Sequence, residues 1–184
     1  MSRRAGRIFD EYLAASARAG DRKAFSRLAE RWQPKLLAHA YRLIGERDAA
    51  RDVTQDAWAD IINSLSRLED VRVFPAWAYR IVSRRAADVI RVKQRDRKLQ
   101  SEYAADGDNS VEDIESRAEG AGLSAAINAL PNDQRAAIAL FYLEDLSVAE
   151  IAAALRVPAG TVKTRLMHAR RKLRAALEGG KENG

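Results

Sequence analysis

Apolar residues recur at helical spacing along most of this chain, and the alternation typical of β-strands is weak throughout. In the first half, helical patterns cover residues 8–19, 22–32, 36–44, 48–61 and 75–98. Asp21 is suited to cap the second pattern, and Gly20 and Gly45 are suited to end helices. Pro34 is expected to interrupt the chain between the second and third patterns, whereas Pro75 fits a helix start. The patterns predict an all-α protein.

A sharp change of composition after Lys98 divides the chain into two parts. Between residues 102 and 119 there are seven acidic residues against a single base, Arg117, and glycines punctuate the segment and its end. Such a stretch has little core of its own. We therefore expect two small helical domains joined by a flexible acidic linker, with boundaries at 8–98, 99–122 and 123–177. The residues from Gly179 onward are expected to fray.

A helix-turn-helix is predicted in the second domain. Ser147 and Glu150 have the spacing of a capping box, and Pro158 separates the short helix that they begin from a longer one. On the longer helix, one side is apolar, and no acid occurs between Thr161 and Ala176. A helix that enters the DNA major groove needs base-reading side chains in its centre and cations along its edges. The candidate DNA contacts on this helix are Lys163, Thr164, Arg165, Met167, His168 and Arg171.

A solvated basic helix near the end of a chain is the simpler alternative, because cations near a helix C-terminus also interact favourably with the helix dipole. The charge run alone therefore does not decide between the two interpretations. The capped short helix and the apolar turn that precede the run favour DNA binding.

The first domain carries two further charged faces. On the helix after residue 48, polar and acidic side chains lie beside an apolar face; this group comprises Asp48, Asp52, Gln55 and Asp56. Such a face suits a basic partner helix, although it is also compatible with plain solvation. The helix after Pro75 is rich in cations and has aromatic residues near its start, and these residue types bind phosphates and stack on unpaired bases. Its candidate DNA contacts are Trp77, Arg80, Arg84, Arg85 and Arg91, although core packing is the simpler role for Trp77.

Overall charge and residue usage narrow the function classes. The net charge of +6 suits a polyanionic partner, and the absence of cysteine excludes disulfides and thiolate-bound metals. The two histidines, His39 and His168, lie far apart, and His39 is expected to pack in a core rather than to bind a metal. No glycine-rich phosphate loop or nucleophile motif occurs, so neither catalysis nor a cofactor is expected. No apolar run is long enough to span a membrane, so membrane insertion is not expected.

Several motifs follow one another along the two predicted domains. The first domain contains Ala19-Gly20-Asp21-x-x-Ala24-Phe25, Asp52-Val53-x-Gln55-Asp56-Ala57 and Phe74-x-Ala76-Trp77-x-Tyr79-Arg80-Ile81. The second domain contains Leu146-Ser147-x-x-Glu150-Ile151-Ala152 and Val157-Pro158-x-Gly160-Thr161-Val162-Lys163-Thr164-Arg165-Leu166. These motifs resemble those of extracytoplasmic-function (ECF) sigma factors of bacterial RNA polymerase. The first three are similar to the opening of that family, its polymerase-binding helix and its promoter-melting helix, and the last two are similar to its promoter-reading domain. The resemblance covers residues 10–177 in the family's order.

The resemblance implies a factor that directs promoter-specific transcription initiation in the cytoplasm. The first domain would be sigma region 2, which docks on the β′ coiled coil of core RNA polymerase and opens the −10 element of promoter DNA, with a flipped-out base held by the loop at about 66–74. The second domain would be sigma region 4, which reads the −35 element; the β flap is a further expected polymerase contact. Many relatives have Asn where Arg84 stands, which leaves a phosphate contact for Arg84. The family also implies control by an anti-sigma factor.

Three points stay open from sequence alone. The linker either threads the active-site and RNA-exit channels of the polymerase, as the resemblance implies, or is a solvated tether. A repressor or activator with the same helix-turn-helix is an alternative, although the first domain lacks the βα alternation of a receiver domain. A sigma mimic that only titrates an inhibitor is a third possibility, although such a protein would lack the two basic helix faces.

Overall fold

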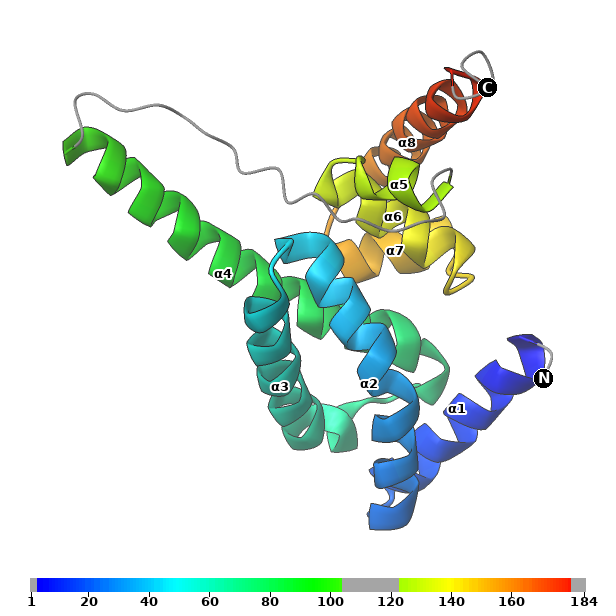
Figure 1. The fold of residues 1–184 in the computed structure, drawn as a ribbon. Helices are drawn as coiled ribbons and strands as arrows, with labels where there is room; N and C mark the ends of the chain where they lie inside the picture. The colour runs from blue at the N-terminus through cyan, green and yellow to red at the C-terminus, as the bar shows by residue number, and fades with distance from the viewer. Residues whose placement is uncertain (1–2, 104–122, 180–184) are drawn as a thin grey trace.

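The computed structural model describes residues 3–103 and 123–179, and within these ranges the chain contains helices and no strand (Figure 1), which confirms the all-α prediction. The first domain contains α1 (Arg3–Arg18), α2 (Arg22–Ile44), α3 (Arg47–Ser64), the 3₁₀ turns η1 (Leu65–Arg67) and η2 (Val71–Val73), and α4 (Phe74–Tyr103). The second domain contains α5 (Leu123–Asn128), α6 (Asn132–Tyr142), α7 (Val148–Leu155) and α8 (Ala159–Gly179). The parts of the expected linker at 104–122 and of the tail at 180–184 lie outside the described residues.

Helix α2 is continuous, so the prediction that Pro34 interrupts it is wrong. Its ends follow the predicted chemistry: the Asp21 side chain accepts hydrogen bonds from the first-turn amides, and Gly45 has a left-handed φ of 84°. Proline removes one hydrogen bond from the ladder of a helix. Trp32 and Leu36, on either side of Pro34, are both buried in the core, and this packing offsets the lost bond.

Helix α4 begins beside Pro75, as predicted, and continues five residues past Lys98 to Tyr103. No proline or glycine occurs between Pro75 and Gly107, so nothing in the local sequence ends the helix at Lys98. In Figure 1 the C-terminal half of α4 extends away from the bundle of α2 and α3.

The core of the first domain contains aromatic and polar side chains as well as aliphatic ones. The Trp32 ring packs edge-on against Phe74 at 5.1 Å and tilts against Tyr79 at 5.5 Å between centroids. His39 is fully buried, and its Nε2 lies 2.9 Å from Ser83 Oγ, which confirms the predicted packing role. Burial, with a smaller effect of nearby Arg42, lowers the pKa of His39 to about 3. The histidine is therefore neutral in the folded protein at neutral pH.

The second domain forms around the predicted helix-turn-helix. The Ser147 amide donates to Glu150 Oε2 at 2.8 Å, and the Glu150 amide donates to Ser147 Oγ at 3.2 Å, so the capping box is present at the start of α7. Arg156 ends α7 with a φ of 58°. The core of the second domain is formed by small and aliphatic side chains, among them Leu140, Ile151 and Val162. The motif therefore rests on local signals that the sequence displays directly.

The two domains contact each other in this structure (Figure 1). Helix α7 packs against α4, and α6 packs against α2. The contact leaves α3 and most of α8 on the outside of the molecule.

Candidate nucleic-acid and protein interfaces

Helix α8 presents one polar face to solvent. Val162, Leu166 and Ala169 are buried against the rest of the second domain. The side chains that project outward from the same helix are Lys163, Thr164, Met167 and Arg171, and all of them are exposed. Met167 is large and apolar but 56% exposed, as suits a side chain that contacts a partner rather than the core. The structure thus brings together these four of the predicted DNA contacts on one face.

The other two predicted contacts on α8 lie away from that face. Arg165 is half-buried, and its Nε lies 3.1 Å from Asp133 Oδ2 on α6, so its charge is used within the domain. His168 is also half-buried at the flank of the face. At about 100° per residue, position 165 is roughly 160° from Met167 around the helix. The helical period therefore contains the signal that separates Arg165 from the outward face.

A hollow of about 370 Å³ lies between the loop after α3 and the start of α4. Its lining includes Leu68, Val73 and Trp77. Trp77 is half-buried and packs against Phe74 with 5.9 Å between ring centroids, so it belongs to the core and also borders the hollow. This is the segment in which the sequence analysis expects a flipped-out base.

The loop that borders this hollow is held by residues that the sequence analysis missed. Arg18 donates from its guanidinium to the carbonyl oxygens of Leu68 and Glu69, each at 2.8 Å. Asp70 accepts hydrogen bonds from the Arg72 amide and guanidinium, and these bonds lower the pKa of the Asp70 carboxyl. Arg18 is 50 residues away from Leu68 in the chain, so no local pattern reveals the contact.

The cations of α4 are less available than their number suggests. Arg85 donates to both carboxylate oxygens of Asp60 at 2.8 and 2.6 Å, and Arg84 donates to Asp60 Oδ2 at 2.8 Å. The hydrogen bonds from Arg85, and to a smaller extent the one from Arg84, lower the pKa of the Asp60 carboxyl. Arg91 pairs with Asp88 at 3.1 Å. Arg80 is exposed and forms no ion pair within the described ranges.

The acidic face of α3 points away from the core. Asp48, Asp52, Gln55 and Asp56 are all exposed, while Val53 and Ala57 on the opposite side are buried. Asp48 has one contact of 3.4 Å, to Arg51 on the same helix. Asp52 and Asp56 form no ion pair among the residues that the structure describes. Asp60 continues this face by one turn, a spacing that could have identified it from sequence.

The comparisons with known proteins agree with this arrangement. Residues 28–96 match the family model of sigma-70 region 2, and residues 121–173 match that of sigma-70 region 4. The RNA polymerase sigma-H factor of Pseudomonas aeruginosa is 30% identical over 92% of this chain and 94% of its own length. The ECF RNA polymerase sigma factor SigW of Bacillus subtilis is 31% identical over 86% of this chain and 91% of its own length. This chain belongs to the ECF sigma factors.

Two solved structures share the fold of this chain. CnrH, in a complex with the cytosolic domain of CnrY, aligns with a TM-score of 0.61 at 27% identity, over 93% of this chain and 98% of that chain. The sigma factor RpoE of Bartonella quintana, in a complex with the anti-sigma factor NepR, aligns with a TM-score of 0.60 at 25% identity, over 85% and 98% of the two chains. The first and second domains are accordingly called region 2 and region 4 below.

As an ECF sigma factor, the protein is a transcription-initiation factor that binds core RNA polymerase and promoter DNA. Within the described ranges, no helix is long and apolar enough to cross a bilayer. No cluster of three or more His, Asp or Glu side chains in those ranges could hold a metal ion.

Proposed function

We propose that region 2 docks on core polymerase through the acidic face of α3, with Asp52 and Asp56 at its centre. Both carboxylates are exposed and free of ion pairs within the described part of the chain, so they are available to a basic helix. The β′ coiled coil is the partner that the family implies for this face, and the β flap is a further contact.

The −10 element engages the start of α4 and the adjacent loop. Arg80 supplies an exposed cation for phosphate, and the hollow beside Trp77 supplies a place for an unstacked base. Arg84, Arg85 and Arg91 reach phosphate only by exchanging the carboxylates that hold them in this structure. The hollow beside Trp77 would therefore hold a base by its shape, and the cations along α4 would bind phosphates by their charge.

The −35 element is read by the outward face of α8 in the major groove. Lys163 and Arg171 suit phosphates or guanine edges, Thr164 suits a base edge, and Met167 suits the methyl group of thymine. Arg165 supports this face from within the domain through Asp133. His168 flanks the base-reading face.

One observation carries the proposal: two faces of opposite charge, on α3 and α8, are exposed on separate domains of one ECF sigma factor. Run-off transcription with purified core polymerase and promoter fragments tests it. The expected result is a discrete transcript that depends on this chain. A chain that binds DNA selectively but never associates with core polymerase would instead be a regulator with a helix-turn-helix.

Control by an anti-sigma factor is part of the proposal. One similar solved structure is the sigma factor RpoE in a complex with the anti-sigma factor NepR. Another is CnrH in a complex with the cytosolic domain of CnrY. Co-purification of this chain with a candidate inhibitor, followed by loss of the run-off transcript, tests the expectation. The proposed site of action is the cytoplasm, where the polymerase is found.

A further inference from the structure

Region 4 packs on region 2 through α7 on α4 and α6 on α2, and a small set of polar bonds also crosses this contact. Lys35 Nζ on α2 lies 3.0 Å from Glu144 Oε2, in the turn that connects α6 and α7. Arg7 on α1 pairs with Glu150 at the start of α7. Asn132 Nδ2 donates to the Leu43 carbonyl oxygen at 2.9 Å. These bonds join two helices of region 2, α1 and α2, to region 4, so the contact is specific rather than a glancing one.

Glu144 is the least exposed charged side chain among these bonds. Its side chain is only 12% exposed, and it lies at a cavity of about 240 Å³ that is also lined by Trp32, Lys35 and Tyr79. The Lys35 ammonium lies 4.9 Å from the centroid of the Trp32 ring, which holds the cation in place. Burial and the nearby Glu144 carboxylate both raise the pKa of the Tyr79 phenol. The Glu144 side chain therefore lies against the region 2 residues that line this cavity.

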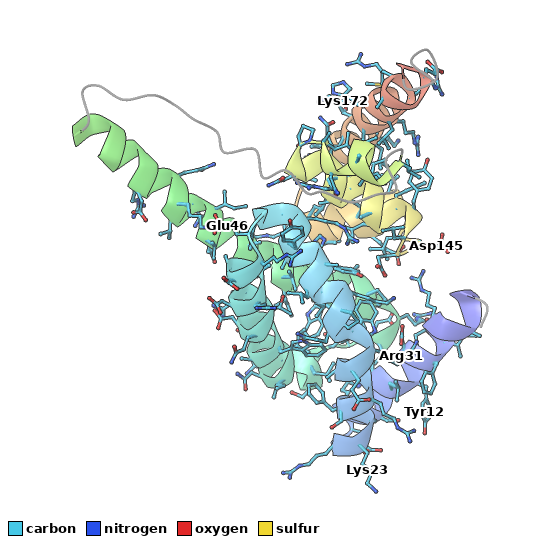
Figure 2. The ribbon with its side chains drawn as sticks, viewed as in Figure 1. Tyr12, Lys23, Arg31, Glu46, Asp145 and Lys172 are labelled. Atoms are coloured by element: carbon cyan, nitrogen blue, oxygen red, sulfur yellow. The ribbon has the colours of Figure 1, made fainter. Side chains whose placement is uncertain are left out.

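The turn that carries Glu144 has a defined shape. Asp145 has a left-handed φ of 56°, and the Leu146 amide donates to the Leu140 carbonyl oxygen at 3.0 Å. Figure 2 shows Asp145 at the end of region 4 that lies nearest to α1 and α2. The backbone thus presents Glu144 to Lys35 without needing a rearrangement.

This closed arrangement does not fit a promoter. The −35 and −10 positions are about 25 base pairs apart, which is roughly 85 Å at about 3.4 Å per base pair. A domain of about 100 residues has a radius of gyration of about 13 Å, so the centres of two touching domains are roughly 30 Å apart. The 19 residues between Tyr103 and Leu123 permit a larger separation, because a chain of about twenty residues can span up to roughly 70 Å.

We propose that Glu144 is an intramolecular latch: bound to Lys35, it holds region 4 against region 2 in the free factor, and its release lets the two domains reach the two promoter elements. The proposal rests on the proposed function for its consequence, but the latch itself is a property of the isolated chain. Closure by this ion pair requires no inhibitor protein. The exposed acidic face of α3 stays accessible in the closed form, so core polymerase can dock before the latch opens.

Single-molecule energy transfer on the purified full-length chain tests the latch. The chain has no cysteine, so Ser26→Cys on α2 and Ala175→Cys on α8 place one dye on each domain at exposed positions. The unmodified latch is expected to give a predominantly closed population at low salt. Glu144→Lys should reduce the ratio of closed to open molecules about tenfold, because it places two cations together in a partly enclosed site.

Three further variants make the result specific. Lys35→Glu combined with Glu144→Lys should restore part of the closure, because the new pair attracts while Arg42, which also lies near position 144, still repels the new lysine. Asp145→Asn, which removes a charge from the neighbouring exposed residue and tolerates its positive φ, should leave closure unchanged. Arg7→Glu should open the contact independently by repelling Glu150, and it lies on the surface of α1, so it keeps the test valid if Glu144→Lys fails to fold.

Two outcomes overturn the latch: an open population in the unsubstituted chain, or closure that persists in both Glu144→Lys and Arg7→Glu. Run-off transcription separates this failure from failure of the proposed function. If the chain initiates transcription but never closes, only the latch is lost. If it closes as expected but gives no transcript with core polymerase, the latch stands as a domain contact and the proposed function is lost.

Discussion

Region 2 and region 4 both carry cations proposed to contact DNA, but they differ in how those cations are held. In region 2, Arg84 and Arg85 share the carboxylate of Asp60, and Arg91 pairs within α4. In region 4, Lys163 and Arg171 form no ion pair within the described ranges. The cations on the outward face of α8 can thus bind phosphate at once, whereas Arg84, Arg85 and Arg91 of region 2 must first exchange internal partners and only Arg80 among the α4 candidates need not. Charge counted along a helix is therefore a poor measure of the charge that a partner meets.

The largest expected effect tests what sets region 2 apart, its acidic face. Asp52→Lys with Asp56→Lys should weaken binding to core polymerase by at least about a hundredfold, because repulsion replaces attraction over a docking face. Fluorescence anisotropy of the labelled factor with core polymerase measures the change. Glu30→Lys with Glu178→Lys introduces the same charge at exposed positions elsewhere and serves as the control. Equal weakening by both pairs would make the effect one of net charge.

A second prediction contrasts the two cores, since region 2 buries His39 and the described core of region 4 is built from small and aliphatic side chains. The pKa of His39 is lowered from 6.5 to about 3 in the folded chain. Below pH 6.5 the unfolded chain therefore binds a proton that the folded chain does not bind. Region 2 should lose roughly 1.4 kcal/mol of stability per pH unit as the pH falls from about 6 to about 4.

Urea unfolding of the full chain at several pH values measures this slope. His39→Gln keeps a hydrogen-bond partner for Ser83 but has no group that titrates, so the slope of this variant should flatten. A slope that is the same in both proteins would assign the acid sensitivity to other groups.

A third prediction sharpens the division on α8. Arg171→Ala should weaken promoter binding by about 1–3 kcal/mol if the side chain reaches a base edge, and the loss should be selective for the cognate −35 sequence. Arg165→Ala is the matched comparison, because Arg165 faces Asp133 rather than solvent. It should alter stability more than sequence selectivity. A loss from Arg171→Ala that is equal on all sequences would make the residue a phosphate contact.

The smallest effect is expected from removing the carboxylate of Asp60, which binds Arg84 and Arg85 in region 2. Asp60→Asn should free Arg84 and Arg85 while changing the free energy of unfolding by less than about 1 kcal/mol, since the ion pairs lie near the surface. Each arginine that then reaches phosphate should steepen the salt dependence of DNA binding by about 0.9 on the double-logarithmic scale. Binding measured across a salt series, with Asp88→Asn as the equivalent change at Arg91, checks this expectation.

Local chemistry made much of this fold predictable, and long-range contacts account for what was missed. Asp21, Gly45 and the Ser147–Glu150 capping box act on neighbouring residues, so the sequence displays them. The continuity of α2 across Pro34 depends on burial of residues around it, and propensity does not report burial. The acidic face of α3 followed from helical period alone.

The candidate site was predicted less completely than the fold. The helical period places Arg165 away from the base-reading face, yet its basic character made it a candidate. The pairing of Asp60 with Arg84 and Arg85, 24 and 25 residues away, depends on how α3 and α4 pack. The contact between Lys35 and Glu144 spans 109 residues and crosses the domain boundary, so no pattern in either domain indicates it.

The unbroken length of α4 has a mechanical consequence. Thirty residues of helix form a rod of about 45 Å at about 1.5 Å per residue. The buried side chains of α4 end at Ala86. About 17 residues, roughly 25 Å of the rod, therefore project beyond the bundle. A tilt of about 10° in this projecting part displaces its end, Tyr103, by about 4 Å. A small tilt near the bundle thus becomes a larger shift at the end of the helix that precedes the segment leading to region 4.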